Sequence, residues 1–106
     1  GLIESESYRP YYMHGTSHWL GLDVHDVGAY VVKNGSGDAK PRPLAAGMAY
    51  TIEPGIYVAP DDADAPDAYK GIGIRIEDDV VITNDGYLNL TREIPKTVED
   101  IEAWTG

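Results

Sequence analysis

The sequence predicts an α+β fold that is mostly strands with few helices, and three observations support this. In the segment GIGIRIEDDVVI, the isoleucines alternate with other residues from Ile72 to Glu77, which is the period of a strand with two different faces. Asn-Asp-Gly at 84–86 is a hairpin turn signal between apolar segments. Thr97 precedes apolar residues at helical spacing, as an N-cap does. The 106 residues have the length of one small domain.

The elements can be assigned in order along the chain. Residues 1–8 are expected to be the end of a helix, which the dipeptide Arg9-Pro10 breaks. A short apolar run at 29–32 precedes residues 33–43, whose Gly, Pro and polar turn formers predict a loop. Strands are predicted at residues 48–52, 56–58, 72–76, 80–82 and 87–90. A turn at 53–55, an acidic loop at 60–69 and a corner at 78–79 separate these strands.

Composition excludes several classes of function. The formal net charge is −10, and this acidic excess argues against binding to nucleic acid or to an anionic membrane surface. No apolar run approaches the roughly 20 residues that span a bilayer, and no signal peptide is visible. Cysteine is absent, which excludes disulfides and thiolate ligands. The cytoplasm is therefore the default expectation for its location.

The histidines are the first sign of a functional site. All three, His14, His18 and His25, fall within twelve positions. His14 and His18 have the spacing of one helical face, but the intervening glycine disfavours a helix there. His25 is followed by Asp26, an imidazole next to a carboxylate, as proton transfer would require. Each histidine alone is more often an ordinary side chain, whereas three together indicate a metal or acid–base site.

Two carboxylates accompany these histidines. Glu53 ends a predicted strand before Pro54, and Glu77 shares a strand face with Arg75, opposite isoleucines that would face an apolar layer. The alternatives are a plain strand-ending glutamate and a surface ion pair. Imidazole and carboxylate donors without sulfur suit divalent zinc, manganese, cobalt or iron.

Three segments, HGTSHWLGLDVHD, TIEPGIY and GIGIRIEDDVVIT, resemble the carboxy-terminal part of Xaa-Pro aminopeptidases. These enzymes, also called aminopeptidase P, are pita-bread metallopeptidases related to creatinase, prolidase and methionine aminopeptidase. The resemblance covers roughly residues 8–104 and implies the C-terminal half of a pita-bread fold, a mostly antiparallel curved sheet. Residues 1–106 would then be a partial catalytic domain.

The resemblance also implies roles for individual residues. His18, Glu53 and Glu77 match ligands of a centre of two divalent ions, commonly Mn2+, with Zn2+ or Co2+ as alternatives. His14 and His25 match catalytic histidines that are not ligands, and His14 is also expected to bind substrate. Arg75 matches an arginine close to the metals, and Tyr57 matches a tyrosine expected to bind substrate.

Two aspartate ligands of the family lie upstream of the histidine motif, and this chain begins after that point. Asp23 and Asp26 lie inside the motif and cannot replace them. We therefore expect at most one weak metal site, no activity of the isolated chain, and self-association to cover exposed sheet.

The implied activity is removal of the N-terminal residue from peptides with proline in second position, so a proline-containing peptide is the expected partner. The alternatives are a prolidase-type Xaa-Pro dipeptidase and a catalytically inactive pita-bread binding domain. Substrate length would separate a dipeptidase from an aminopeptidase. Loss of metal ligands would be the sign of an inactive binding domain.

Overall fold

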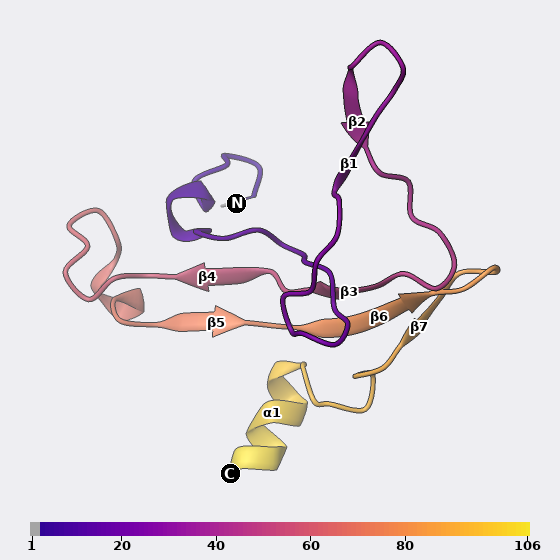
Figure 1. The fold of residues 1–106 in the computed structure, drawn as a ribbon. Helices are drawn as coiled ribbons and strands as arrows, with labels where there is room; N and C mark the ends of the chain where they lie inside the picture. Colours follow the sequence, from indigo (N-terminus) through magenta and orange to yellow (C-terminus); the bar gives the residue numbers. More distant parts are fainter. Residues whose placement is uncertain (1–2) are drawn as a thin grey trace.

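A long antiparallel ribbon dominates the computed structural model, which describes residues 3–106 (Figure 1). Strands β3 (Ala49–Ile52) and β4 (Gly55–Tyr57) follow one another in line. Strands β5 (Gly73–Arg75) and β6 (Asp78–Ile82) run back beside them, β5 against β4 and β6 against β3. The predicted turn at 53–55 is therefore wrong, because the chain passes through it without reversing.

The two halves of the ribbon share one register. Ile52 pairs with Asp78 and Gly55 pairs with Arg75, so counting inward places Glu53 opposite Glu77 and Pro54 opposite Ile76. Pro54 has no N–H to donate, whereas its carbonyl accepts from Ile76 N–H at 3.2 Å. The missing donor explains why the ladder is interrupted at this level, and the shared register places the two glutamates opposite each other there.

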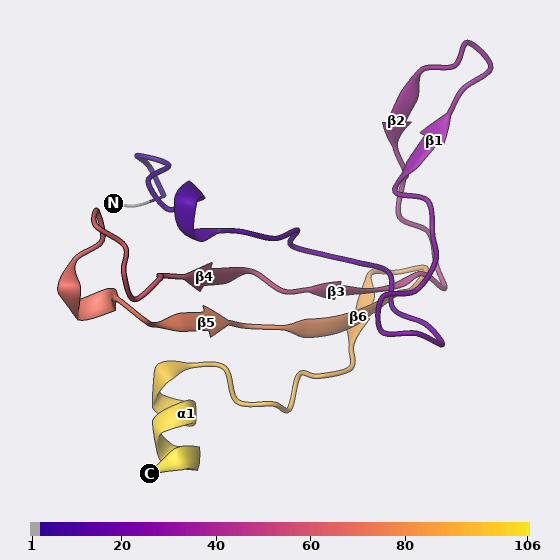
Figure 2. The same cartoon turned by 60° about the vertical axis from the view of Figure 1, so that its left-hand side comes forward.

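Two hairpins extend the ribbon. Strand β7 (Tyr87–Asn89) pairs with β6 across the turn at 84–86, which confirms that prediction. Strands β1 (Val31–Lys33) and β2 (Ala39–Pro41) form an arm that projects from the rest of the molecule (Figure 2). The loop predicted for residues 33–43 is thus wrong at both of its ends, because the turn formers occupy only the tip of this hairpin.

The terminal segments differ in how well the sequence predicts them. Helix α1 (Val98–Thr105) begins as expected, with the Thr97 hydroxyl accepting from Asp100 N–H at 3.1 Å. The helix expected over 1–8 is not formed, since residues 3–8 are turns; residues 1–2 lie outside the described part. Pro10 lies inside a 3-10 helix, η1 (Arg9–Tyr11), where its missing N–H costs nothing.

One further 3-10 helix, η2 (Asp67–Tyr69), lies within the acidic loop. Across residues 3–106, no helix combines the length and the apolar character needed to cross a bilayer. Within the described residues, seven strands accompany one α-helix, which confirms the α+β class.

The core is small and lies around the ribbon. Among the described residues, the buried apolar side chains are Ala65 and Val80, and the buried polar residues are Thr51 and Glu53. The radius of gyration is 17.5 Å, whereas a compact chain of about this length would have roughly 13 Å. An apolar layer was expected over one strand face, but Ile72, Ile74 and Ile76 are 44%, 61% and 45% exposed.

Candidate metal centre

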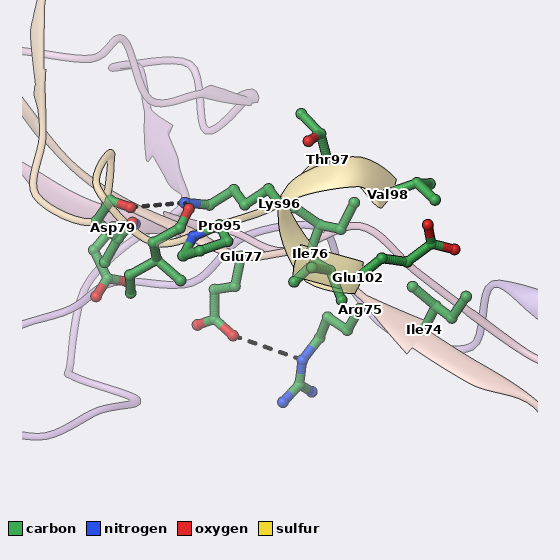
Figure 3. A pocket seen from close by; sticks show the side chains of 13 residues that line it. Ile74, Arg75, Ile76, Glu77, Asp79, Pro95, Lys96, Thr97, Val98 and Glu102 are labelled. Carbon is green, nitrogen blue, oxygen red and sulfur yellow. Dashed lines mark hydrogen bonds and ion pairs between the residues drawn. The ribbon is translucent and has the colours of Figure 1, made fainter. Parts of the chain in front are cut away.

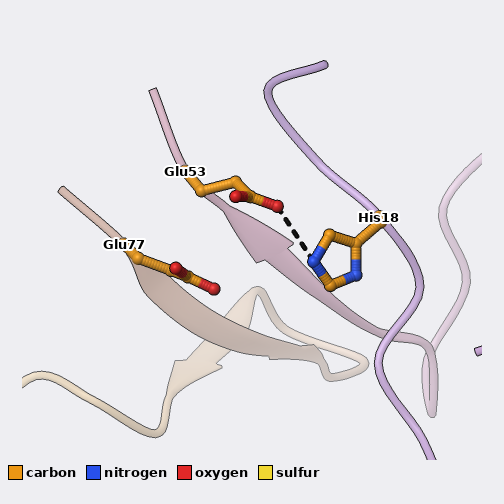
Figure 4. A group of neighbouring side chains, drawn as sticks. All are labelled: His18, Glu53 and Glu77. Carbon is orange, nitrogen blue, oxygen red and sulfur yellow. Dashed lines mark ion pairs between the residues drawn. The ribbon is translucent and has the colours of Figure 1, made fainter. Parts of the chain in front are cut away.

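Three of the residues singled out in the sequence converge at the interruption of the ribbon (Figure 4). His18, Glu53 and Glu77 each offer one ligand atom, and these atoms all lie within 4.8 Å of one another. Donors to one divalent ion, each at about 2.0–2.2 Å, lie at most about 4.4 Å apart. Small side-chain movements would therefore let the three groups share one cation.

The register brings the two carboxylates together. Glu53 and Glu77 face each other across the ribbon, and like charges opposite one another destabilise a sheet. Arg75 is the nearest guanidinium: its Nη1 lies 3.8 Å from Glu53 Oε2 and its Nε lies 3.6 Å from Glu77 Oε2. Both separations exceed normal hydrogen-bond lengths. Arg75 therefore offsets the repulsion only partly, and the position suits a further cation.

His18 comes from a segment that lies along the free edge of β3. Thr51 N–H donates to the His18 carbonyl at 3.0 Å, and Glu53 N–H donates to the Thr16 carbonyl at 2.7 Å. This segment is extended, so the helical alternative for His14 and His18 is wrong. Pairing with β3 fixes the distance between His18 and Glu53, although 35 positions separate them in sequence.

The hydrogen bonds of the His18 ring leave one nitrogen available. Its Nδ1 lies 3.0 Å from the Trp19 carbonyl, which only accepts, so Nδ1 carries a proton. Its Nε2 lies 2.9 Å from Glu53 Oε1, and the side chains are only 14% and 10% exposed. A lone pair on Nε2 facing a carboxylate requires a proton or a metal ion between them. A backbone carbonyl that orients the other ring nitrogen is common in metal sites.

His14 makes a separate contact beside this cluster. Its Nδ1 lies 2.7 Å from the Gly15 carbonyl, so its Nε2 is the acceptor for the Tyr57 hydroxyl at 2.9 Å. Gly55 permits this approach, since a Cβ there would lie 2.7 Å from Tyr57 Oη and 2.9 Å from His14 Nε2. The hydroxyl and the imidazole are thus held as a pair.

His25 lies against the other side of His18, with ring centroids 4.2 Å apart. The suggested partnership of His25 with Asp26 is wrong. The Asp26 carboxylate instead accepts from Leu22 N–H at 3.1 Å and from Val27 N–H at 2.8 Å. Asp26 therefore shapes the loop that carries His25.

Sequence reasoning missed Thr51. Its hydroxyl donates to Glu53 Oε1 at 3.1 Å, and it accepts from His18 N–H at 3.2 Å. The available signal was the strand period, because Thr51 and Glu53 are two apart and share a face.

The donor set fits a divalent metal ion. One imidazole nitrogen and two carboxylates without sulfur match the ligands that zinc, manganese and cobalt accept. The ion would also neutralise the facing glutamates and occupy the space between Nε2 and Oε1. Three donor residues converge in the described part of the chain, which is the number that an open site for one ion needs.

Comparisons with known proteins identify the family of this chain. The model of metallopeptidase family M24 matches residues 1–84. Xaa-Pro aminopeptidase of Escherichia coli is 56% identical over 102 residues, which are 96% of this chain and 22% of the relative. A structure of proline aminopeptidase P II from Yersinia pestis superposes with a TM-score of 0.78 at 55% identity, again over 96% of this chain and 22% of that one.

A zinc-substituted E. coli aminopeptidase P in complex with product gives a TM-score of 0.75 at 55% identity, with the same coverage of 96% and 22%. The chain thus spans about a fifth of the length of these relatives. The family model matches well over half of the chain, with the three converging donors inside its limits. The chain belongs to metallopeptidase family M24.

Proposed function

We propose that this chain is the C-terminal part of the catalytic domain of a Xaa-Pro aminopeptidase, which removes the N-terminal residue from peptides with proline in second position. The observation that carries the proposal is the convergence of His18, Glu53 and Glu77 within 4.8 Å, in a chain so similar to Xaa-Pro aminopeptidases.

These three residues would hold a divalent ion, with Mn2+ proposed first and Zn2+ or Co2+ as alternatives. The zinc-substituted relative supports the view that such a site accepts more than one metal. When bound, the ion would act as a Lewis acid on the scissile carbonyl. Arg75, whose guanidinium lies 3.8 Å from Glu53 and 3.6 Å from Glu77, would offset part of the repulsion between these two carboxylates.

The remaining residues would act on the peptide. The Xaa-Pro bond is a tertiary amide, so its leaving nitrogen needs a proton as the bond breaks. His25 is proposed to assist that transfer, because its ring lies 4.2 Å from the His18 ring and so beside the centre. His14 and Tyr57, joined at 2.9 Å, are proposed to position the substrate carbonyl.

We propose that the 106 residues alone do not hydrolyse peptides. A centre of two ions needs more ligands than the three that converge in the described part, because a second ion would have only a shared carboxylate. A cytoplasmic location is also proposed, and the cysteine-free composition is compatible with a reducing compartment.

A second copy is proposed to cover the isoleucine face of the ribbon. Ile56 and Ile74 are paired positions on that face, 38% and 61% exposed. A cavity of about 680 Å³ lies between this face and α1, with Ile74, Ile76 and Val98 in its lining (Figure 3). The face is apolar in a chain of charge −10, so association through it would not bring acidic side chains of this face together.

The test uses the full-length product of the reading frame that encodes these residues. Mn2+-dependent cleavage of Xaa-Pro tripeptides, lost on chelation and restored by metal, is the expected result. Glu53→Gln should remove activity and metal binding, whereas Glu93→Gln, at an 87% exposed side chain, should leave both unchanged. Cleavage of Xaa-Pro dipeptides alone would indicate a dipeptidase, and metal binding without cleavage would contradict an aminopeptidase.

A further inference from the structure

We propose that Thr51 is a positioning residue that holds both His18 and Glu53 in the geometry needed to bind metal. This inference rests on the proposed metal centre. Thr51 is 1% exposed and lies in β3, directly beside the segment that carries His18. A buried hydroxyl that bonds the carboxylate of one candidate ligand and the backbone N–H of another would act on the centre through those two residues.

The direction of the hydrogen bonds follows from their partners. His18 N–H can only donate, so at 3.2 Å the Thr51 oxygen is its acceptor. The single hydroxyl proton is therefore free for Glu53, whose Oε1 lies 3.1 Å away and accepts it. The Thr51 N–H also donates to the His18 carbonyl at 3.0 Å. Thr51 thus holds both the main chain of His18 and the carboxylate of Glu53 in place.

Within residues 3–106, the Thr51 hydroxyl is the only uncharged group that donates a hydrogen bond to the Glu53 carboxylate. The other two contacts are His18 Nε2 at 2.9 Å and Arg75 Nη1 at 3.8 Å. A metal ion would take the place of the proton between Nε2 and Oε1, and the arginine is too distant for a normal hydrogen bond. Thr51 would therefore be the hydrogen-bond donor of this chain that orients the Glu53 carboxylate toward a bound ion.

Replacing Thr51 by valine removes the hydroxyl and keeps the β-branched shape, which suits a strand. We expect Thr51→Val to weaken Mn2+ or Zn2+ binding by about 10–100-fold, the usual effect of losing a partner that orients a ligand. Thr51→Ser restores the hydroxyl and should restore affinity. The matched control is Thr91→Val, because the Thr91 hydroxyl bonds Asp78 Oδ1 at 2.8 Å, a carboxylate outside the cluster.

The experiment measures apparent dissociation constants for Mn2+ and Zn2+ in the full-length product, by competition with a chelating dye. A second readout needs no metal: amide exchange at His18 should quicken in the metal-free Thr51→Val protein and stay unchanged in Thr91→Val. Thermal unfolding of both valine variants separates loss of stability from loss of metal affinity. Thr51→Val and Thr91→Val can both lower the melting temperature, but only Thr51→Val should weaken metal binding.

The outcomes are distinguishable. If the full-length protein without substitutions binds neither Mn2+ nor Zn2+, the proposed metal centre is wrong and the inference about Thr51 is refuted with it. If that protein binds metal and Thr51→Val binds equally tightly, or Thr91→Val loses as much affinity, only the inference is overturned. Should Thr51→Val not fold, Thr51→Cys decides in its place, because a thiol is a weak donor. Affinity equal to that of threonine would then overturn the role.

Discussion

Gly55 decides whether the His14–Tyr57 pair can form, and Gly55→Ala tests this directly. A Cβ at Gly55 would lie 2.7 Å from Tyr57 Oη and 2.9 Å from both His14 Nε2 and Tyr57 Cε2. Ordinary contact begins at 3.4 Å, so the hydroxyl must move by about 0.7 Å. The His14–Tyr57 hydrogen bond, 2.9 Å long, cannot survive that movement unchanged.

The effect on stability should be small because two terms oppose each other. Alanine in an extended strand gains about 0.4–1 kcal/mol by restricting the unfolded chain. Loss of the hydrogen bond costs about 0.5–1.5 kcal/mol. The melting temperature should thus change little, whereas kcat/KM for an Xaa-Pro tripeptide should fall on the order of tenfold to a hundredfold, as expected for sub-ångström misplacement of a substrate-positioning group.

The assay combines steady-state kinetics of the full-length product with histidine ring spectra by NMR. The His14 ring signals should shift in Gly55→Ala and stay in place in Gly35→Ala, where a new Cβ would meet nothing within 4 Å. Unchanged His14 signals together with an unchanged kcat/KM would refute the reasoning.

Three further predictions concern the surface, the arm and the C-terminal segment. Ile74→Lys should reduce self-association, because it charges a 61% exposed residue at the centre of the isoleucine face; equal sedimentation of both proteins would contradict the proposed dimer. Hydrogen bonds from Ser36 and Asn34 lower the pKa of Asp38 below its ordinary 3.8. Its contribution to the arm is therefore complete above pH 3.8 and lost as pH falls through the lowered pKa, and Ser36→Ala should raise that pKa in an NMR titration; an unchanged value would contradict the contact. Lys96→Met removes contacts to Asp78 Oδ1 at 3.0 Å and to two carbonyls. The free energy of unfolding should therefore fall by about 1–3 kcal/mol; an unchanged melting temperature would contradict a stabilising role of Lys96.

Local patterns predicted those elements that local physics controls. The turn at 84–86 and the start of α1 after Thr97 were both confirmed, because turn and cap preferences act over a few residues. The arm was missed, since its pairing joins Val31 to Pro41 across a tip that looks like a loop throughout. Pro54 was misjudged for a related reason: a proline can interrupt a ladder without turning the chain.

The candidate site divides in the same way. His18, Glu53 and Glu77 were recognisable because their residue types and motifs match a family, and their side chains do converge. Thr51 and Gly55 were not, because their roles depend on His18 and His14, which lie in a distant segment: Thr51 accepts from His18 N–H, and Gly55 leaves room for His14 beside Tyr57.

The sequence by itself determined the strands that follow residue 48, the turn at 84–86, the family and the candidate donor residues, because periodicity, turn chemistry and motifs are properties of neighbouring residues. Only the tertiary structure decided that Glu53 stands opposite Glu77, that His18 faces Glu53 at 2.9 Å, and that the isoleucines of β4 and β5 stay between 38% and 61% exposed. Register and burial depend on the pairing of segments far apart in the chain, and hydrogen bonds between those segments set them.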